Sequence, residues 1–490
     1  MPPILALDQS TSATKAVLFT DQGTVLDRTA REHRQIYPQP GWVEHDAEEI
    51  WRNTLEVVRD LAARRDLSTL AGVSIANQRE TIVIFERGTG RPLYHAMVWQ
   101  CRRGDDLCRA LARAGQNEII RGRTGLRVDT YFSASKLQWL VRARPDLASK
   151  LKAGGALLGT IDTYLVYRLT GGRLFATDPT NASRTLLFNV RRLRWDDTLC
   201  ELFEVPPRAL PEVRESSAQF GETDVEGILA RPVPIRGVMG DSQASLFAQA
   251  CFKTGMAKAT FGTGTSVLLN IGGEFQLPAE GLVCALAWVI GGQPTYAFEG
   301  IINYSAATVA WLQHQLGLID DAAETESLAR AVGDNGGVYL VPAFAGLSAP
   351  YWKPDARAAI VGMTAHTRRE HIVRAALESI AYQLRDVLDV MKSGATISLQ
   401  SIHADGGPTA NGFLMQFVAD LCGLELRVAN VSESSAWGAA SAGLLGLGIH
   451  KSRDTLAGLP RPWSLYRPQM ATERAQRLLE GWQSAVKRVL

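Results

Sequence analysis

The two halves of the chain begin with the same local pattern: an apolar run, a short turn of small residues and a second apolar run. In the first half, Ile4–Leu7 and Ala16–Phe19 flank a turn rich in serine and threonine. In the second half, Met256–Phe261 and Ser266–Ile271 flank the Gly-Thr-Gly-Thr turn at 262–265. Apolar runs of this length, bounded by small residues, are typical of β-hairpins. Two halves that each open with a hairpin predict a duplicated α/β fold with a cleft between the copies.

The length of the chain also supports two domains. At 490 residues it exceeds what a single hydrophobic core usually organises. We expect an N-terminal domain over residues 1–250 and a C-terminal domain over residues 251–490, divided where the pattern restarts. No proline- or serine-rich linker marks this boundary in the sequence.

Charge and composition exclude several classes of partner. The formal net charge is only +2, so no global field favours nucleic acid or a membrane surface. The sequence contains no uncharged apolar stretch long enough to span a bilayer, and its first residues lack the basic start of a signal peptide. The six cysteines are dispersed and form no C-x-x-C pair. We therefore expect a cytoplasmic protein with reduced thiols, no nucleic-acid partner and no membrane insertion.

Further strands and helices are predicted around these hairpins. Leu70–Ile75 and Thr81–Phe85 have the composition of strands. Asp46 is a suitable N-cap for a helix. The apolar stripe of that helix comprises Ile50, Leu55, Val58 and Leu61. Residues 100–215 are predicted to be mainly helical, and a long helix is predicted from about Glu370.

Two aspartates lie where apolar runs end. Asp8 follows Ile4–Leu7, and Asp241 lies shortly after the run Val233–Val238. Three turns of small residues accompany them, at 9–12, 262–265 and 405–409. Such turns can bring backbone N–H groups up to phosphate. One carboxylate can hold hydrated Mg²⁺ and the other can take a proton from an attacking hydroxyl, so the pattern predicts a Mg-nucleotide phosphotransferase.

Other catalytic motifs are absent or incomplete. The sequence has no P-loop, no strand-linked G-x-G-x-x-G of a dinucleotide site and no H-E-x-x-H. The run at 240–244 is one glycine short of a nucleophile elbow, so a serine hydrolase is an alternative, although no histidine motif completes a triad. Each small turn alone is more often structural than functional, and Trp99 and Tyr131 are also compatible with core aromatics.

Taken together, the order and the amino-acid sequences of these and further segments resemble those of the FGGY carbohydrate kinases, and among them most closely the glycerol kinases. The resemblance covers about residues 4–450. The segments that carry it include Leu5–Gln9, Gly41–Asp46, Asn77–Thr81, Val98–Gln100, Tyr131–Leu137, Thr180–Thr185, Phe261–Gly264, Pro342–Leu347 and Asp405–Gly407.

The resemblance implies a fold and an activity. The fold is α/β, with two actin-like, RNase H-like domains of the sugar kinase/actin superfamily that close over a central cleft. The activity is ATP-dependent phosphorylation of a terminal hydroxyl of a small polyol or sugar, with ATP and Mg²⁺ as cofactors. A homodimer or homotetramer is expected.

The resemblance also assigns roles to single residues. Asp241 matches the catalytic base, and Asp8 matches the carboxylate that positions Mg²⁺, with Asp241 beside it. The acceptor pocket comprises Arg79, Glu80, Trp99, Tyr131, Asp241, Ser242 and Ser266. The nucleotide site comprises Thr11, Ser12, Lys15, Thr263, Gly264, Ala306, Gly407 and Asn411.

Two positions in the acceptor pocket depart from the glycerol kinase pattern. Ser242 stands where glycerol kinases carry Gln, and Ser266 stands where they carry Phe. Both replacements are smaller, so the pocket is expected to be larger and more polar. Glycerol is the leading substrate on overall similarity, and a four- or five-carbon polyol or ketose, such as a tetritol, ribulose or xylulose, is the alternative.

A non-kinase alternative is an actin-like ATPase, which shares the fold but lacks an acceptor pocket. Arg79, Glu80, Trp99 and Asp241 argue against it. A sugar sensor without catalysis would be expected to lose Asp8 or Asp241, and the sequence keeps both.

Overall fold

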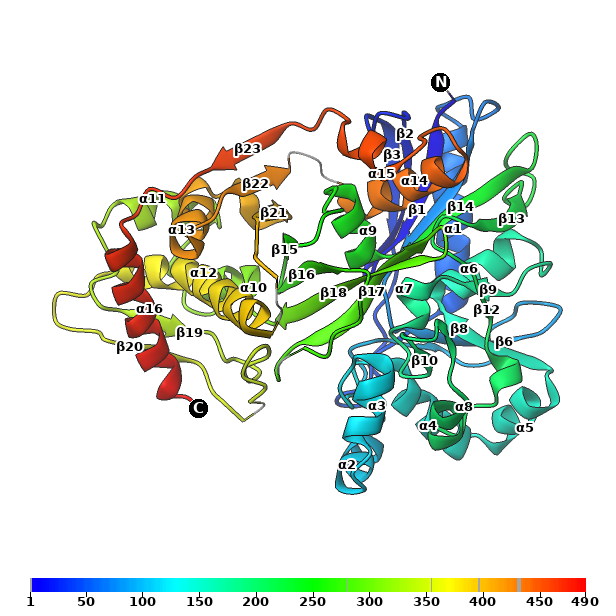
Figure 1. Cartoon of the computed structure of the whole chain (residues 1–490), viewed down its shortest axis with the longest axis horizontal. Coiled ribbons are helices and arrows are strands. Elements are labelled where there is room, and N and C mark those ends of the chain that lie inside the picture. Colours follow the sequence, from blue (N-terminus) through cyan, green and yellow to red (C-terminus); the bar gives the residue numbers. More distant parts are fainter. Residues whose placement is uncertain (1, 279, 354, 395–396, 430–432) are drawn as a thin grey trace.

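The computed structural model describes residues 2–278, 280–353, 355–394, 397–429 and 433–490. Figure 1 shows two lobes, each built around one large sheet that helices cover. The sheet of the first lobe has the strand order β13 (Gln219–Thr223), β14 (Val233–Gly240), β5 (Gly72–Asn77), β1 (Ile4–Gln9), β2 (Ala13–Phe19) and β3 (Val25–Glu32). The sheet of the second lobe has the order β17 (Val283–Ile290), β18 (Gln293–Ile302), β16 (Thr265–Gly272), β15 (Met256–Phe261), β21 (Ser401–Asp405), β22 (Leu426–Ala429) and β23 (Trp463–Tyr466).

The two sheets share one plan of five strands. In each, an antiparallel hairpin, β1–β2 or β15–β16, pairs through its first strand with a parallel strand, β5 or β21. A second parallel strand, β14 or β22, lies beyond it, and an antiparallel strand, β3 or β18, pairs with the second strand of the hairpin. The predicted duplicated α/β fold is therefore confirmed, and the two hairpins occupy equivalent places.

Helix α1 (Ala47–Ala62) begins where the sequence predicted it. The side chain of Asp46 accepts a hydrogen bond from the backbone N–H of Glu48 and caps the helix. The buried apolar face comprises Ile50, Trp51, Val57, Val58 and Leu61. Three of the four predicted stripe residues are thus confirmed, while Leu55 is only partly buried because the helix packs along a face one position away.

The region 100–215 is mainly helical, as predicted, but short strands interrupt it. Its helices are α2 (Asp105–Arg113), α3 (Asn117–Thr124), α4 (Ser133–Ala143), α5 (Pro145–Ala153), α6 (Ile161–Leu169), α7 (Pro179–Ala182) and α8 (Asp197–Leu202). Strand β8 (Ala156–Thr160) pairs with β6 (Ile82–Glu86), which extends through β7 (Ala96–Met97) to β4 (Glu44–His45). The two-residue strands are β9 (Ala176–Thr177), β10 (Phe188–Asn189), β11 (Arg194–Trp195) and β12 (Glu212–Val213).

Helices of the second lobe surround its sheet (Figure 1). They are α10 (Ala306–His314), α11 (Glu324–Arg330), α12 (Arg369–Gly394), α13 (Gly412–Cys422) and α16 (Thr472–Lys487). A two-stranded sheet of β19 (Tyr339–Val341) and β20 (Ala359–Val361) lies beside them. The predicted long helix is confirmed as α12, whose Ala376, Ile380 and Leu384 are buried in the core of this lobe.

Three helices connect the lobes: α9 (Asp241–Ala248), α14 (Ser434–Gly446) and α15 (Arg453–Ala457). Helix α14 packs on the first sheet through a buried cluster that contains Ile4, Ala6, Val17, Phe19, Ala436, Trp437, Ala440 and Leu444. The chain therefore passes between the lobes from α9 to β15, from β22 to α14 and from α15 to β23 (Figure 1). A boundary at residue 250 stays a prediction, since residues 434–457 return to the first lobe.

All six cysteines are buried and unpaired. In the described part of the chain, no helix is both long enough and apolar enough to cross a bilayer.

Candidate active site

Asp241 lies where the buried strand β14 ends and α9 begins. Its carboxylate Oδ1 accepts a hydrogen bond from the N–H of Ser242 at 2.6 Å and lies 3.4 Å from Nε of Arg79. The side chain is 34% exposed, so a substrate can reach it. The start of α9 and the guanidinium of Arg79 both place positive charge beside this carboxylate. The carboxylate is therefore held in a fixed, partly exposed position at the end of β14, which is compatible with the predicted role of base.

Arg79 is the buried partner of Asp241. Its Nη2 donates to Oε1 of Glu299 at 2.8 Å, and its Nη1 donates to Oε1 of Gln243 at 3.3 Å. A Cβ at Gly240 would lie 2.7 Å from Cγ of Arg79, so only glycine lets the side chain pass under the end of β14. Arg79 thereby ties the second-lobe sheet to the helix that carries Asp241.

A second buried pair completes this network. Arg184 donates from Nε to Oε1 of Glu80 at 2.5 Å, and its Nη1 lies 2.5 Å from Oε2 of Glu299. Burial alone would raise the pKa of Glu299, but Arg184 and Arg79 outweigh it and hold that pKa at about 2. Two cations and two carboxylates thus balance in a site closed to water, where pairing is needed to offset desolvation.

Glu80 lies in the turn between β5 and β6 with a positive φ of 61°. Its backbone carbonyl accepts a hydrogen bond from the hydroxyl of Ser133 at 2.8 Å. This conformation is uncommon for a residue with a side chain and costs on the order of 1–3 kcal/mol, and strain of this kind clusters at functional sites. The network through Arg184 keeps Glu80 in place.

Asp8 is the buried penultimate residue of β1. Within the described chain, its Oδ1 has no hydrogen-bond partner. Burial raises the pKa of Asp8 to about 7; Lys15 lowers it, and the carboxylates of Asp241 and Glu433 add to the rise. Lys15 lies opposite Asp8 in the hairpin, and its Nζ is 2.9 Å from Oε2 of Glu433. A buried carboxylate with an unused oxygen is a suitable first ligand for a hard cation.

The two expected pocket aromatics lie together. The ring centres of Trp99 and Tyr131 are 5.2 Å apart. Nε1 of Trp99 donates to the hydroxyl of Thr11 at 3.0 Å. Burial raises the pKa of Tyr131, with a further rise from Glu80. The structure therefore brings the predicted acceptor pocket into contact with the first predicted phosphate turn.

Ser266 lies in β16, between Thr260 of β15 and Ile301 of β18. Thr260 and Ser245 of α9 both donate to the carboxylate of Asp405, so this side of the sheet faces α9. The hydroxyl oxygen of Ser266 is buried and has no hydrogen-bond partner among the residues that the structure describes. The Phe that glycerol kinases are expected to carry at this position would have no polar oxygen to satisfy.

The second predicted phosphate turn is held against the start of α10. The N–H groups of Ser305 and Ala306 donate to the carbonyls of Thr263 and Gly262 at 2.8 Å and 3.0 Å. A Cβ at Gly264 would lie 2.2 Å from the carbonyl oxygen of Ile302, so only glycine fits this turn. Thr263 is exposed, and Ser12 of the first turn is exposed as well.

Gly407 is the first residue of a short 3₁₀ helix, η2 (Gly407–Ala410), and Asn411 follows its end. A Cβ at Gly407 would meet open space. The side chain of Asn411 caps α13 and also donates from Nδ2 to the hydroxyl of Thr325 at 3.1 Å. Its amide is thus already used by the fold, whereas the backbone at Gly407 is open to a ligand.

Several residues of this site were not predicted from the sequence as site residues. They are Arg184, Gln243, Glu299, Asp405 and Glu433. Glu299 carried a usable signal, because a lone acid within an apolar strand implies a buried ion pair. Its partner Arg79 is 220 residues away in the sequence, so the pairing itself could not be read there.

The model of the N-terminal domain of the FGGY family of carbohydrate kinases matches residues 3–248, and the model of the C-terminal domain matches residues 257–447. The chain is 45% identical over 489 residues to glycerol kinase 1 of Thermotoga maritima, covering 99% of each chain. It is 46% identical over 490 residues to a glycerol kinase of Symbiobacterium thermophilum, covering 99% of this chain and 98% of the relative.

Solved structures agree with these matches. Plasmodium falciparum glycerol kinase with ADP superposes with a TM-score of 0.95 at 36% identity, covering 100% of this chain and 98% of the other. A ligand-bound xylulose kinase from Lactobacillus acidophilus superposes with a TM-score of 0.90 at 19% identity, covering 99% of this chain and 97% of the other, which supports the fold alone.

Proposed function

The chain belongs to the FGGY family of carbohydrate kinases, and we propose that it phosphorylates glycerol with ATP, giving sn-glycerol 3-phosphate and ADP. The enzyme class is that of a phosphotransferase with an alcohol group as acceptor. The observation that carries the proposal is the partly exposed carboxylate of Asp241, held 3.4 Å from the buried Arg79 at the start of α9. This is the arrangement that a general base for a substrate hydroxyl requires.

In the proposed reaction, a terminal hydroxyl of glycerol lies against Asp241. The carboxylate accepts the hydroxyl proton as the oxygen attacks the γ-phosphorus, and the bond to the ADP oxygen breaks. Arg79 stays charged and fixes the position of Asp241, because Glu299 and Gln243 hold its other nitrogens. Trp99 and Tyr131 supply an apolar wall for the carbon chain.

The phosphates of ATP are assigned to the two small turns. Thr11 and Ser12 of the first turn and Thr263 and Gly264 of the second would present backbone N–H groups and hydroxyls to them. Lys15 would add positive charge next to the first turn. The remaining nucleotide contacts are assigned to Ala306, Gly407 and Asn411. The ADP of the Plasmodium kinase supports a nucleotide donor.

Asp8 and Asp241 fit a magnesium ion. Mg²⁺ is usually held by one or two carboxylates together with waters and substrate phosphates. Asp8 offers an oxygen that no described residue uses, and the carboxylate of Asp241 is close enough to raise its pKa. Bound Mg²⁺ would neutralise charge on the β- and γ-phosphates.

An ADP-release assay over a panel of acceptors tests the proposal. The panel contains glycerol, tetritols, pentitols and ketoses, each at matched concentration with ATP and Mg²⁺. Glycerol is expected to give the highest kcat/KM. A rate of ADP release that no acceptor increases would contradict the proposal. It would favour the alternative of an actin-like ATPase.

A four- or five-carbon polyol or ketose is the second candidate substrate. The observation that favours it is the buried hydroxyl of Ser266, which has no partner among the described residues. A longer substrate could bring a hydroxyl to this oxygen, with Ser242 as a second polar neighbour. A higher kcat/KM for a tetritol, ribulose or xylulose than for glycerol would establish this alternative.

The cellular setting follows from the same proposal. Six unpaired buried cysteines suit a reducing compartment such as the cytoplasm. The homodimer or homotetramer expected from the resemblance stays a prediction, which sedimentation velocity would test.

A further inference from the structure

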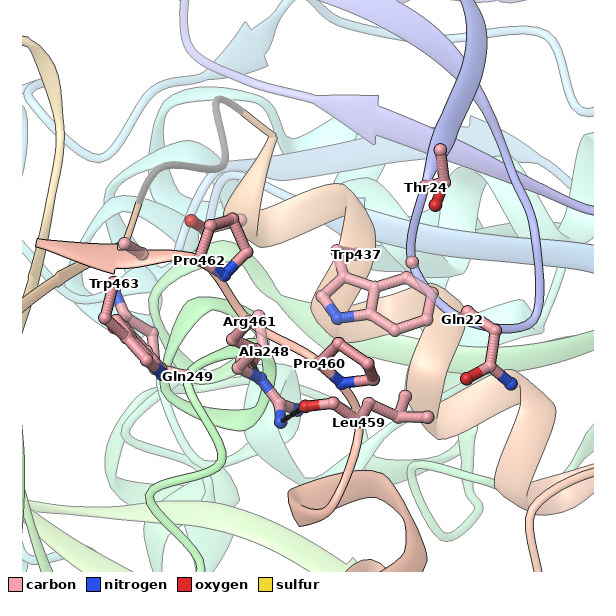
Figure 2. Close-up of a pocket in the computed structure, with 13 residues that line it drawn as sticks. Gln22, Thr24, Ala248, Gln249, Trp437, Leu459, Pro460, Arg461, Pro462 and Trp463 are labelled. Atoms are coloured by element: carbon pink, nitrogen blue, oxygen red, sulfur yellow. Dashed lines mark hydrogen bonds between the residues drawn. The ribbon is translucent and has the colours of Figure 1, made fainter.

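A cavity of about 200 Å³ lies at the hinge between the lobes, at the end of α9 opposite Asp241. Ala248 and Gln249 line it from the end of α9, and Ser434 and Trp437 line it from the start of α14. Residues 459–463, which lead into β23 and include its first residue, complete this wall. All three places where the chain passes between the lobes therefore contribute to its wall. We call this space the hinge cavity (Figure 2).

Gln249 is the most unusual residue of the hinge cavity. Its side chain is buried, yet neither its Oε1 nor its Nε2 has a hydrogen-bond partner anywhere in the described chain. Only its backbone is engaged, since its carbonyl bonds Nδ1 of His403 at 2.9 Å. Buried polar side chains are nearly always hydrogen-bonded in native proteins, so an unused amide that lines a cavity points to a missing ligand.

The hinge cavity also contains an uncompensated positive charge. Arg461 donates to the backbone carbonyls of Ala248, Leu456, Ala457 and Leu459. No carboxylate of the described residues forms an ion pair with it, and the lining residues include no acid. A partly buried cation without a counter-ion favours a ligand that brings a negative charge.

Two tryptophans give the hinge cavity flat apolar walls. Figure 2 shows Trp463 beside Gln249 and Trp437 beside Pro460, with Arg461 between the two tryptophans in this view. The ring of Trp437 packs on Phe19 with centres 5.3 Å apart, so it is held by the first lobe. Aromatic rings favour offset or edge-on contact with other aromatic rings. A cavity of about 150 Å³ is known to hold a benzene ring, so this one has room for a single ring with a substituent.

We propose that the hinge cavity binds a small planar aromatic monocarboxylate. Its ring lies against Trp463 and Trp437, and its carboxylate accepts a hydrogen bond from Nε2 of Gln249 in the field of Arg461. Because all three inter-lobe segments line the cavity, closure of the lobes changes its shape. Occupation of the hinge cavity and occupation of the catalytic cleft are therefore thermodynamically coupled, each altering the affinity of the other.

Calorimetric titration of the full-length protein with three probes tests the ligand class. Benzoate and nicotinate are expected to bind with similar affinity, and nicotinamide, the uncharged analogue of nicotinate, about tenfold or more weakly, since a charge-assisted hydrogen bond is lost. If neither carboxylate gives binding heat at ~10 mM, a concentration above the dissociation constants of weak specific binding, the proposal is overturned. Equal binding of nicotinate and nicotinamide would refute the assigned role of the charge.

Variants locate the bound probe. Gln249→Glu adds a carboxylate inside the cavity and should abolish benzoate binding, whereas Gln315→Glu adds the same charge on an exposed position after α10 and should leave it unchanged. If Gln249→Glu does not fold, Gln249→Met serves instead. It removes no hydrogen bond, so the melting temperature should be kept or raised while benzoate binding weakens about fivefold or more. Wild-type benzoate affinity in the variant that folds would overturn the site.

The coupling has its own readout. Benzoate is titrated at increasing concentrations of glycerol with a non-hydrolysable ATP analogue. Its affinity is expected to change by about fivefold or more and then to level off at saturation, as linkage between separate sites requires. If the benzoate affinity instead keeps falling as the glycerol and ATP analogue concentrations rise, benzoate competes in the catalytic cleft and the assignment is overturned. An unchanged affinity would refute the coupling.

Discussion

The two hairpins share a backbone plan but differ in the charge that they carry. In each, the penultimate residue of a six-residue strand faces a partner across the hairpin: Asp8 faces Lys15, and Thr260 faces Ser266. Asp8 is a buried carboxylate with an unused oxygen, and burial raises its pKa to about 7. Thr260 instead donates a hydrogen bond to Asp405, the neighbour in the adjacent parallel strand.

Equivalent positions of the repeated unit are therefore used differently. In the first hairpin Asp8 keeps an oxygen free for a ligand, whereas in the second Thr260 bonds to the neighbouring strand. The first hairpin keeps an unsatisfied charge, which lowers stability unless a cation or phosphate is bound. In the second hairpin the equivalent residue, Thr260, is hydrogen-bonded to Asp405, although the hydroxyl of Ser266 opposite it has no partner among the described residues. If Asp8 holds Mg²⁺ as proposed, the first copy carries a metal ligand at the position where the second copy uses its side chain to hold the sheet together, with no change in the backbone plan.

The largest expected effect falls on Asp241, which lies between the two hairpins. Asp241→Asn should lower kcat by ~10²–10⁴-fold, because the proton acceptor is lost while the size of the side chain is kept. Steady-state ADP release with the preferred acceptor measures it. As a control, Ser435→Ala removes only a hydrogen bond to the backbone carbonyl of Asp241 and should cost less than about tenfold. Near-wild-type turnover of Asp241→Asn would show that Asp241 is not the general base.

The next effect compares the hairpins directly. Asp8→Asn should lower kcat by ~10²–10³-fold and raise the Mg²⁺ concentration needed for half-maximal rate, since a metal ligand is worth several kcal/mol in the transition state. Thr260→Val changes the equivalent residue of the second hairpin and should leave the Mg²⁺ titration in place. A shared response of both variants would mean that the division between the copies is wrong.

A smaller effect is expected in the choice of acceptor, to which Ser242 and Ser266 are assigned. Ser242→Gln with Ser266→Phe should raise kcat/KM for glycerol relative to four- and five-carbon acceptors by ~10–200-fold, the range of pocket-methylene effects. Ratios of kcat/KM over the acceptor panel measure it. An unchanged ratio would show that these two serines do not line the acceptor pocket.

Local patterns predicted the architecture well. The hairpins, the junction of β14 with α9 and the long helix α12 depend on neighbouring residues, because strand alternation, capping and helical periodicity act over short distances. The family and the two-lobed actin-like fold expected from the motifs are confirmed by the family models and by the solved kinase structures.

Contacts between residues far apart in the chain could not be predicted from the sequence. The contact of Arg79 with Glu299 depends on how the second sheet is placed against α9, and the return of α14 to the first sheet depends on packing of Trp437 against Phe19. Ser266 was predicted as a change of pocket size, but the orphaned state of its hydroxyl follows only from the register of β16 between its neighbours. Such contacts join residues hundreds of positions apart and leave no local periodicity.

The smallest expected effect is on stability, and it has opposite signs in the two hairpins. The pKa of Asp8 is raised from its ordinary 3.8 to about 7 in the folded protein, so the folded state binds the proton more tightly than the unfolded state. Its contribution to stability is therefore complete below about pH 4 and is lost as pH rises towards about 7. In metal-free buffer at pH 8, Asp8→Asn should raise the free energy of unfolding and flatten its decline between these values. Thr260→Val should lower it by ~1–3 kcal/mol at every pH, because the buried carboxylate of Asp405 loses a donor. Urea denaturation from pH 4 to pH 8 measures both. If Asp8→Asn were destabilised at pH 8 as much as Thr260→Val, Asp8 would be a satisfied structural residue, and the two hairpins would differ in sequence but not in role.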